Sequence, residues 1–395
     1  MKIIADLHIH SRFSRACSKN INIENLEKYA KIKGLNLLGT GDFTHMKWRK
    51  ELDEKLKEDE YGILRTQTGF PFLWQTEISL MYTQDGKGRR VHFVILAPNK
   101  SVVNQITETL GKKGRLDYDG RPIFGFSGIE LVDMMMNISK DIEIIPAHAY
   151  TSWFGILGSR SGFDSVEECF KEKSKYIHAI ETGISSDPEM NWRLSSLDKY
   201  TLVSFSDMHS FWPWRMGREA TVFNCDLKYK DIINAIRTKK GLVETIECFP
   251  QYGKYHNDGH RSCGVSMSPK ESRKLNKLCP VCHKEMTIGV EYRIEELADR
   301  PVGFTPKNSI PFKRLLPLAE LIASVYNTTP STKKVSIDLN KLTDKFGSEL
   351  NVLLDIPEYK LESIVNEKIV NIIMKNRAGS LVVKPGDDGL YGKII

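Results

Sequence analysis

The stretch KIIADLHIH, residues 2–10, is a strand-like apolar run that ends in His8 and His10. Residues two apart on a strand point to one face, so two imidazoles at this spacing can bind one metal ion. Taken alone, such a pair is equally well explained by surface histidines that alternate by chance. The same pattern recurs downstream, however. Five further apolar runs contain a histidine or an acid near their ends: LNLLGTGDF (35–43, Asp42), FLWQTEIS (72–79, Glu77), DIEIIPAHAY (141–150, His148), YIHAIETGI (176–184, Glu181) and YTLVSFSDMHS (200–210, Asp207 and His209). His92 lies at the start of another run, VHFVILAP (91–98).

These runs predict a shared polar site. In a barrel of alternating strands and helices, side chains at the carboxyl ends of different strands converge on one face. Converging imidazoles and carboxylates are the ligands of zinc or manganese. The sequence therefore predicts an α/β metal hydrolase with more than one ion.

The composition agrees with a soluble globular protein. The length of 395 residues predicts two or three domains. Of these residues, 41% are hydrophobic and 27% are charged, as is typical of globular proteins. The net charge of +7 favours an anionic partner only slightly. No apolar stretch reaches about 18 residues, so no membrane span is expected. His8 and His10 interrupt the first apolar run, which argues against a signal peptide. Four scattered cysteines are typical of a reducing cytoplasm.

The chain divides into three regions. Residues 1–247 alternate strand-like and helical patterns, which predicts an α/β domain with helices over 24–33, 128–140, 188–197 and 229–240 and a long loop over 112–126. Residues 248–305 are rich in cysteine and histidine and predict a metal-stapled module. Residues 306–395 show mostly helical periodicity and end in a predicted hairpin turn over 385–389.

The middle region carries a second metal pattern. HRSC provides His260 and Cys263, and CPVC provides Cys279 and Cys282, with fifteen residues between the two pairs. Two such pairs at this spacing are typical of a structural zinc site, because each tight turn supplies two ligands. His256 and, more weakly, His283 compete as the fourth ligand.

The first 245 residues or so resemble the polymerase and histidinol phosphatase (PHP) superfamily. The resemblance rests on DLHIH, the GTGD step, TEIS, VHFVIL, IIPAHA and FSDMH, in that order. It implies a distorted (β/α)7 barrel with two or three divalent ions (zinc, manganese or magnesium). One ion would bind His8, His10, Glu77 and Asp207; a second would share Glu77 and add His92 and His148. His209 would serve a third ion.

The sequence departs from the superfamily pattern at that third site. Phe43 stands where a histidine often follows the aspartate, and Arg15, Ala16 and Cys17 stand where another histidine is usual. Asp42, Cys17 or His45 would have to substitute. Glu181 is either a ligand, a residue that orients His148, or a plain acid at the edge of the core.

Basic and aromatic residues beside the motifs are candidates for substrate binding. Arg12 and Arg15 follow the first motif and Arg218 follows the last, where they could neutralise phosphates. For any one of them, a solvated surface charge is the simpler reading. The aromatic candidates, for which core packing is the competing explanation, are Trp153, Phe154, Phe211, Trp212 and Trp214.

Nearly the whole chain resembles the endonuclease Q family of DNA-repair nucleases. The marks are DLHIHSRFSRACSKN, AHAYTSWFGILGSRSGFDS, SFSDMHSFWPWRMGREAT, the CPVC ribbon and PGDDGLYGKI, although His260 stands where the resemblance implies cysteine. The resemblance implies metal-dependent cleavage 5′ to uracil, hypoxanthine, xanthine and abasic sites, with Asp207, Glu77, Arg15 and Arg218 in the catalytic machinery. It also implies damaged DNA as partner, a cytoplasmic and nucleoid-associated location, and replication or repair proteins as further candidate partners. The alternative is a phosphatase that acts on a small phosphate monoester.

Overall fold

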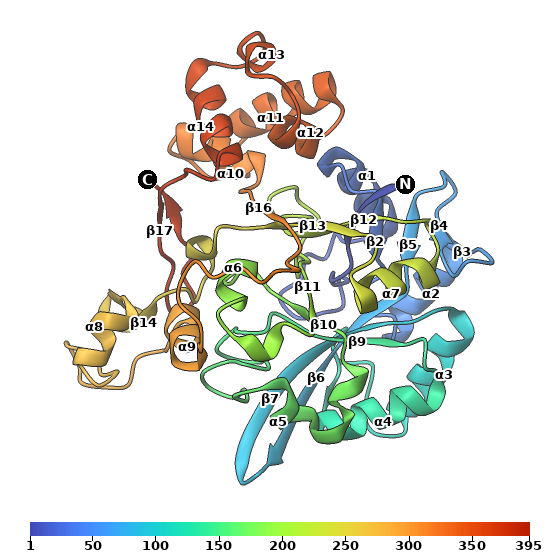
Figure 1. Ribbon diagram of the computed structural model, residues 1–395. Coiled ribbons are helices and arrows are strands. Elements are labelled where there is room, and N and C mark those ends of the chain that lie inside the picture. The colour runs from blue at the N-terminus through green and yellow to red at the C-terminus, as the bar shows by residue number, and fades with distance from the viewer.

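The computed structural model describes residues 1–395 and is built around an eight-stranded sheet (Figure 1). In this sheet β1 pairs parallel with β2 on one side and antiparallel with β12 on the other. In spatial order the strands are β16 (Phe312–Arg314), β13 (Leu242–Glu247), β12 (Ala220–Asn224), β1 (Lys2–Asp6), β2 (Leu37–Gly39), β5 (Pro71–Leu73), β4 (Leu64–Arg65) and β3 (Lys57–Glu58).

Two smaller strand groups complete the arrangement. A long antiparallel hairpin, β6 (Gln75–Gln84) and β7 (Lys87–Leu96), pairs with β8 (Ile123–Phe124) and β9 (Glu143–Pro146). The second group is β10 (Ala179–Glu181) with β11 (Thr201–Val203). Main-chain bonds connect the groups: Ala149 N donates to Glu181 O at 2.9 Å and His10 N donates to Met208 O at 3.3 Å. The strands therefore follow one another around a distorted ring, and the predicted α/β class is confirmed.

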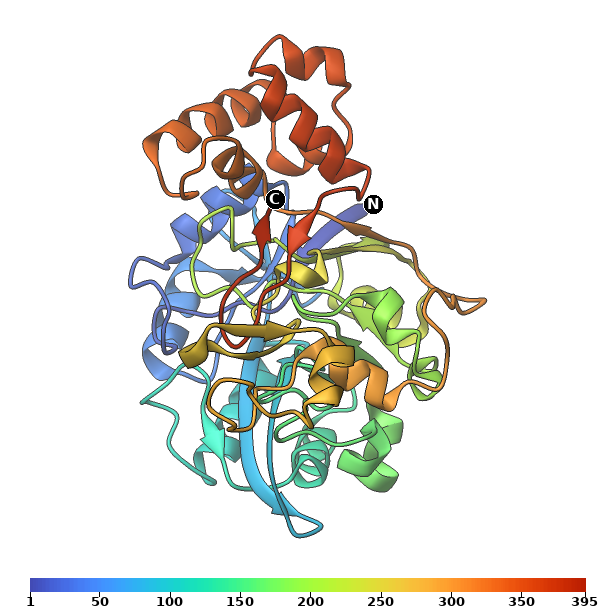
Figure 2. The same cartoon turned by 90° about the vertical axis from the view of Figure 1, so that its left-hand side faces the viewer.

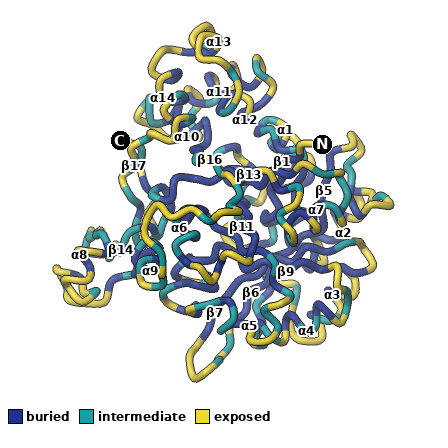
Figure 3. Tube along the Cα trace, viewed as in Figure 1, coloured by how far each residue is buried: buried dark blue, intermediate teal, exposed yellow.

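A buried apolar cluster fills this ring. It takes Ile3 and Ala5 of β1 and Leu7 directly after it, together with side chains from β2, β5, β7, β9, β10 and β11. Alternation along a strand sends these side chains to one face. Ile232 and Ile236 of helix α7 belong to the same cluster. Figure 3 shows the buried segments at the centre of the molecule.

Helices pack outside the strands, largely where the periodicity predicts them. Asn22 caps α1 by accepting from Asn25 N, and Gly34 ends it at φ +99°. Ser127 and Glu130 form a capping box at α4. The helix predicted over 188–197 is shorter, because the chain turns extended at Leu194, whose side chain is buried. These helices are α1 (Ile23–Lys33), α2 (Met46–Lys55), α3 (Lys100–Gly111), α4 (Gly128–Ile138), α5 (Val166–Phe170), α6 (Pro188–Asn191) and α7 (Tyr229–Thr238).

Residues 250–297 form a small lateral lobe that has little regular structure. Figure 1 shows it beside the ring. Its elements are β14 (Asp258–His260), β15 (Val265–Met267), α8 (Pro269–Lys274) and α9 (Val290–Leu297). The chain then returns to the large sheet, where β16 pairs parallel with β13.

The next five helices pack together above the sheet (Figure 1). They are α10 (Leu318–Val325), α11 (Lys333–Phe346), α12 (Glu349–Leu354), α13 (Glu358–Glu362) and α14 (Glu367–Arg377). The C-terminal segment then leaves them and runs back down as the hairpin β17 (Val383–Lys384) and β18 (Lys393–Ile394), as Figure 2 shows. Gly386 N donates to Gln251 O at 2.8 Å and Gly392 N donates to Tyr252 O at 3.0 Å, so the hairpin is bound to the base of the lobe.

No helix of the structure combines the length and the apolar character that a membrane crossing requires.

A buried ion pair joins the helical region to the ring. Lys33 at the end of α1 is 1% exposed, and its Nζ lies 2.6 Å from Glu349 Oε1 at the start of α12. The same oxygen accepts from Leu318 N at 3.0 Å. A Cβ on Gly34 would lie 2.7 Å from Ser348 Oγ, so the two chain segments are in close contact beside the pair.

We expect Lys33→Met to destabilise the protein by about 3–5 kcal/mol, because the buried Glu349 carboxylate would lose its partner. The double variant Lys33→Met with Glu349→Leu should recover most of this loss, since it removes both charges. Chemical denaturation of the three proteins measures the difference. A single variant as stable as the native chain would contradict the role given to this pair.

Candidate metal centre and active site

Apart from His92, which lies on β7, the predicted ligands come from four separate parts of the ring. His8 and His10 directly follow β1, and Glu77 lies on β6. His148 follows β9 and Asp207 follows β11. The last two adopt left-handed backbone angles, φ +33° for His148 and +46° for Asp207. Such angles in residues other than glycine cost about 1–3 kcal/mol and gather at functional sites, where the surrounding structure fixes them.

The structure brings these side chains into two groups of donor atoms that share Glu77. The first group is His8, His10, Glu77 and Asp207, and the second is Glu77, His92 and His148. Within each group the donor atoms lie within 4.8 Å of one another. His10 Nε2 is 3.1 Å from both Glu77 Oε2 and Asp207 Oδ1, and His92 Nδ1 is 2.9 Å from Glu77 Oε1.

Both groups fit divalent cations. His8 Nε2 is buried and has no hydrogen-bond partner, although it faces Glu77 Oε1 and Asp207 Oδ1 at 3.5 Å each. A cation between these atoms would satisfy all three. Burial lowers the pKa of His92 to about 3, so its imidazole is neutral at pH 7, as metal binding requires. Imidazole with carboxylate is a donor set typical of zinc and manganese.

Glu181 lies outside both donor groups and orients two of their members. Its carboxylate oxygens lie 2.9 and 3.1 Å from His8 Nδ1. Its Oε2 also accepts from the backbone N–H of His148 at 2.7 Å. Burial lowers the pKa of His8, but Glu181, Glu77 and Asp207 outweigh this effect and raise it well above the ordinary value. Carboxylates that hold the far nitrogen of a metal-binding histidine fix its tautomer and ring orientation.

Asp42 has the same role toward His10 and is not free to bind a third ion. Its Oδ1 lies 3.1 Å from His10 Nδ1. Its Oδ2 accepts from Ser11 N and Ser11 Oγ, both at 2.6 Å, and from Ser14 Oγ at 2.9 Å. With both oxygens engaged, Asp42 orients a ligand.

The other candidates for a third site are also dispersed. His209 Nδ1 lies 3.1 Å from the backbone oxygen of Asp207, and its ring packs 4.8 Å from that of His10. The ring of His45 stacks on Phe13 at 4.5 Å. Cys17 lines the cavity beside His209 but joins neither donor group.

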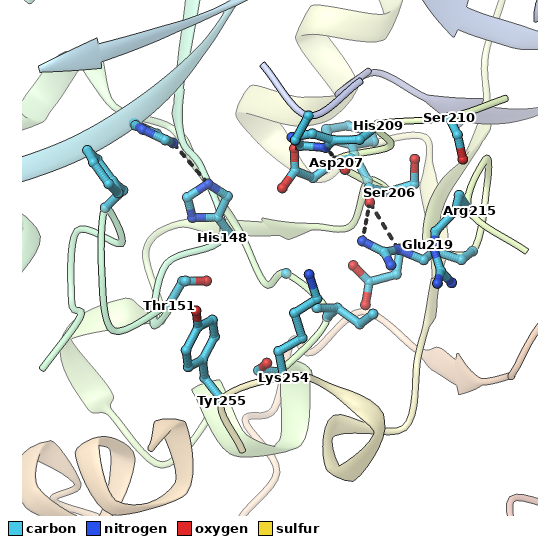
Figure 4. Close-up of a pocket in the computed structure, with 18 of the residues that line it drawn as sticks. His148, Thr151, Ser206, Asp207, His209, Ser210, Arg215, Glu219, Lys254 and Tyr255 are labelled. Carbon is cyan, nitrogen blue, oxygen red and sulfur yellow. Dashed lines mark hydrogen bonds and ion pairs between the residues drawn. The ribbon is translucent and has the colours of Figure 1, made fainter. Parts of the chain in front are cut away.

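A cavity of about 920 Å³ opens beside the two donor groups (Figure 4). One wall carries His92, His148, Asp207 and His209. The opposite wall comes from chain segments far away in sequence. It includes Ser185, which precedes the lateral lobe in the sequence, and Lys254 and Tyr255, which lie at the start of the lobe. Tyr391 of the C-terminal hairpin also belongs to it.

The two arginines predicted to neutralise phosphates differ in position: Arg218 lines the cavity, whereas Arg15 is not among its lining residues. Arg218 is buried, and its Nε and Nη2 donate to Ser206 O at 3.1 and 3.0 Å. Its Nη1 donates to Tyr391 Oη at 3.2 Å, so it fixes the cavity wall. The side chain of Arg15 is 72% exposed and lies 3.3 Å from Asp119. Arg12 donates to Ile21 O at 2.9 Å and pairs with Glu51, away from the cavity.

The aromatic candidates divide into two sets. Trp153 and Phe154 line the cavity, and Phe154 stacks on His92 at 4.3 Å. Phe211, Trp212 and Trp214 are not among the lining residues. Phe211 and Trp212 pack against Tyr29 of α1, and Trp214 stacks on Trp212. These three therefore form a separate cluster.

Sequence reasoning missed Arg121 and Tyr391. Arg121 lies in the loop over 112–126, and its Nη1 donates to Glu77 Oε2 at 2.9 Å. No periodicity marks that loop, and only its GRP sequence suggests a fixed bend. Lys254 and Tyr391 reach the cavity through long-range packing, for which a single sequence carries no local pattern.

The lateral lobe holds the third group of donors. His260, Cys263, Cys279 and Cys282 have ligand atoms within 4.8 Å of one another, and Cys282 Sγ lies 3.4 Å from His260 Nδ1. Burial raises the pKa of Cys279, but the backbone N–H groups of Cys282 and Val281 outweigh it and lower the value to about 6. Thiolates with one imidazole in a closed set of four fit a zinc ion. His256 instead lies near Glu291, and the distance from His256 Nε2 to Glu291 Oε2 is 3.6 Å.

The chain is similar over its full length to two solved structures. One is the lesion-specific endonuclease PfuEndoQ from Pyrococcus furiosus, with 32% identity, coverage of 100% of this chain and 95% of that chain, and a TM-score of 0.88. The other is endonuclease Q in complex with a 27-mer duplex that has an abasic lesion at the active site. Its identity is 32%, its coverage 100% and 96%, and its TM-score 0.90.

Two further matches concern parts of the chain. Residues 317–380 match the family model described as the MJ0043 C-terminal domain. The uncharacterized protein MJ0043 of Methanocaldococcus jannaschii is 30% identical over 253 residues, which are 62% of this chain and 31% of that protein. The match thus spans about a third of the length of that relative.

A PHP-type α/β fold with two donor groups on a shared carboxylate defines a metal-dependent phosphodiesterase. Within that class, the full-length similarity decides the family. The chain belongs to the endonuclease Q family of lesion-specific DNA endonucleases.

Asp207→Asn should lower the content of divalent ions in the barrel and reduce phosphodiester hydrolysis about 10³-fold or more, because the first donor group loses a charged oxygen. Elemental analysis and hydrolysis of bis(p-nitrophenyl) phosphate measure the two effects. Asp226→Asn, the same change at an exposed position, is the control. Full metal content and full activity in Asp207→Asn would refute the ligand assignment.

Cys279→Ser should release one zinc ion per chain and open the lateral lobe to proteases, since a structural site of this type contributes about 10–16 kcal/mol of apparent binding energy. A chromogenic zinc chelator and limited proteolysis check both expectations. Cys225→Ser changes a cysteine outside the donor group and should do neither. Zinc content equal to that of the native chain would show that Cys279 is not a ligand.

Proposed function

We propose that the protein cuts DNA at the phosphodiester on the 5′ side of uracil, hypoxanthine, xanthine and abasic sites. One water is consumed. A bond forms between the water oxygen and phosphorus, the bond from phosphorus to O3′ of the preceding nucleotide breaks, and O3′ leaves with a proton. The products are a 3′-hydroxyl and a 5′-phosphate.

The observation that carries this proposal is the cavity beside the donor groups. Its volume of about 920 Å³ lies at the upper end of the roughly 300–1,000 Å³ typical of ligand pockets, which leaves room for a nucleotide beyond the ions. An enzyme that acts on a base within a duplex commonly extrudes it into such a pocket. The full-length similarity to an endonuclease Q bound to duplex DNA supports the same conclusion.

The far wall of the cavity is rich in hydrogen-bond donors. Lys254 Nζ lies 4.7 Å from the centre of the Tyr391 ring, and Arg218 donates to the hydroxyl of that ring. Burial and the neighbouring Glu247 raise the pKa of Glu219 well above its ordinary value, which favours a protonated carboxyl that can donate. Deamination replaces an amino donor of the base by a keto acceptor. A donor-rich wall therefore suits deaminated bases and disfavours cytosine and adenine.

The metal assignment follows from the donor sets. The barrel ions would be held by His8, His10, Glu77 and Asp207 and by Glu77, His92 and His148, and four imidazoles favour zinc or manganese over magnesium. When bound, such a pair of ions supplies positive charge at both the entering and the leaving oxygen. The protein orients these ligands through Glu181 and Asp42. We further propose zinc in the lateral lobe.

The cytoplasm, close to the nucleoid, is the proposed location because that is where the substrate lies. Contact with replication or repair proteins stays a prediction.

The decisive comparison uses end-labelled duplexes that differ only in one central base, uracil or cytosine. We expect a single cut 5′ to uracil, at least about 10²-fold less cleavage of the cytosine duplex, and a steep fall in DNA binding as salt rises. p-Nitrophenyl phosphate should be a poor substrate. Rapid hydrolysis of that monoester with an intact uracil duplex would favour the phosphatase alternative and overturn the proposal.

A further inference from the structure

Arg121 places a permanent positive charge inside the metal centre. Its Nη1 lies 2.9 Å from Glu77 Oε2, the carboxylate that both donor groups share. The guanidinium lines the cavity together with His148, Asp207 and His209. A guanidinium has five N–H donors, and only Nη1 has an acceptor within the protein. The donors on Nε and Nη2 are therefore free for a substrate.

The loop that carries Arg121 is fixed at several points. Ser79 N donates to Pro122 O at 3.0 Å, and β8 begins directly after that residue. Gly120 N donates to Phe13 O at 3.1 Å. A Cβ on Gly120 would lie 2.3 Å from Asp42 Oδ2, so only glycine lets the loop approach this closely. The guanidinium is thus held in place by the backbone on both sides of it.

The same loop lies against the residues that would have to form a third cation site. Asp42 is engaged by His10, Ser11 and Ser14, and the loop at Gly120 covers it. His45 is turned against Phe13. Asp42 and His45 are therefore engaged by other residues, while a guanidinium with free N–H groups lines the adjacent cavity.

We propose that Arg121 takes the place of a third cation and binds a non-bridging oxygen of the scissile phosphate. This inference rests on the proposed phosphodiester chemistry. The planar fork of Nε and Nη2 matches two phosphate oxygens, and its charge opposes the negative charge that gathers on phosphorus during hydrolysis. The hydrogen bond from Nη1 to Glu77, the carboxylate that both donor groups share, fixes the orientation of Nε and Nη2.

The opposing view is that Arg121 only holds Glu77 in position. The two roles differ in what removal of the side chain does to metal content. If Arg121 only positions Glu77, its removal should lower the metal content. If it binds phosphate, its removal should leave the ions in place and slow the reaction. A small guanidinium added from solution can restore only the second role.

The test compares Arg121→Ala and Arg121→Lys with the native chain on the uracil duplex and on bis(p-nitrophenyl) phosphate. We expect Arg121→Ala to retain native metal content while its kcat falls about 10²–10³-fold on both substrates. Added methylguanidinium should restore part of that loss. Arg121→Lys keeps the charge but not the fork and should be intermediate. Arg115→Ala, an exposed arginine of the same loop, is the matched control.

Three results would overturn the proposal: native kcat in Arg121→Ala, loss of barrel ions in parallel with activity, or a third barrel ion in the native chain. The second substrate separates this proposal from the lesion specificity. If the native chain left the uracil duplex intact but hydrolysed the diester, the proposed specificity would fail, and the effect of Arg121 would still be measured on the diester.

Discussion

The shared carboxylate of Glu77 is the constraint on which the rest of the site depends. It is fully buried, and it faces His8, His10, His92, His148 and Arg121. Burial raises the pKa of this carboxyl, yet the surrounding His92, Arg121 and His8 hold it well below its ordinary value. A buried carboxylate of this kind is stable only when it is paired or binds a metal ion. The ring of strands, the left-handed angle at His148 and the loop at Gly120 all serve to place its partners.

The cavity unites parts of the chain that would otherwise be separate. The ring supplies the two donor groups, the start of the lateral lobe supplies Lys254 and Tyr255, and the C-terminal hairpin supplies Tyr391. Arg218 connects the ring to that hairpin through the Tyr391 hydroxyl. The wall of the cavity is therefore complete only when the last residues of the chain pack against the base of the lobe. The donor group of the lobe is not among the residues that line the cavity.

The sequence predicted much of the centre because its ligands follow a simple rule. Buried strands end in histidines or acids, and strand ends converge, so His8, His10, His148 and Asp207 were recognisable from local patterns. The helices at 24–33 and 128–140 were recognisable from capping residues and from Gly34. The roles of Asp42 and Glu181 were harder to assign, because a carboxylate that binds an ion and one that orients a ligand look alike in sequence. Arg121, Lys254 and Tyr391 depend on contacts between distant segments, and no periodicity encodes such contacts.

Anomalous scattering from crystals of the purified protein tests the central claim most directly. Data on either side of the absorption edge of the bound metal locate each ion independently of activity. Two peaks are predicted in the barrel, one among His8, His10, Glu77 and Asp207 and the other among Glu77, His92 and His148, with Arg121 beside them and no ion at Asp42. An empty centre in active crystals, or ions held by other side chains, would contradict this account.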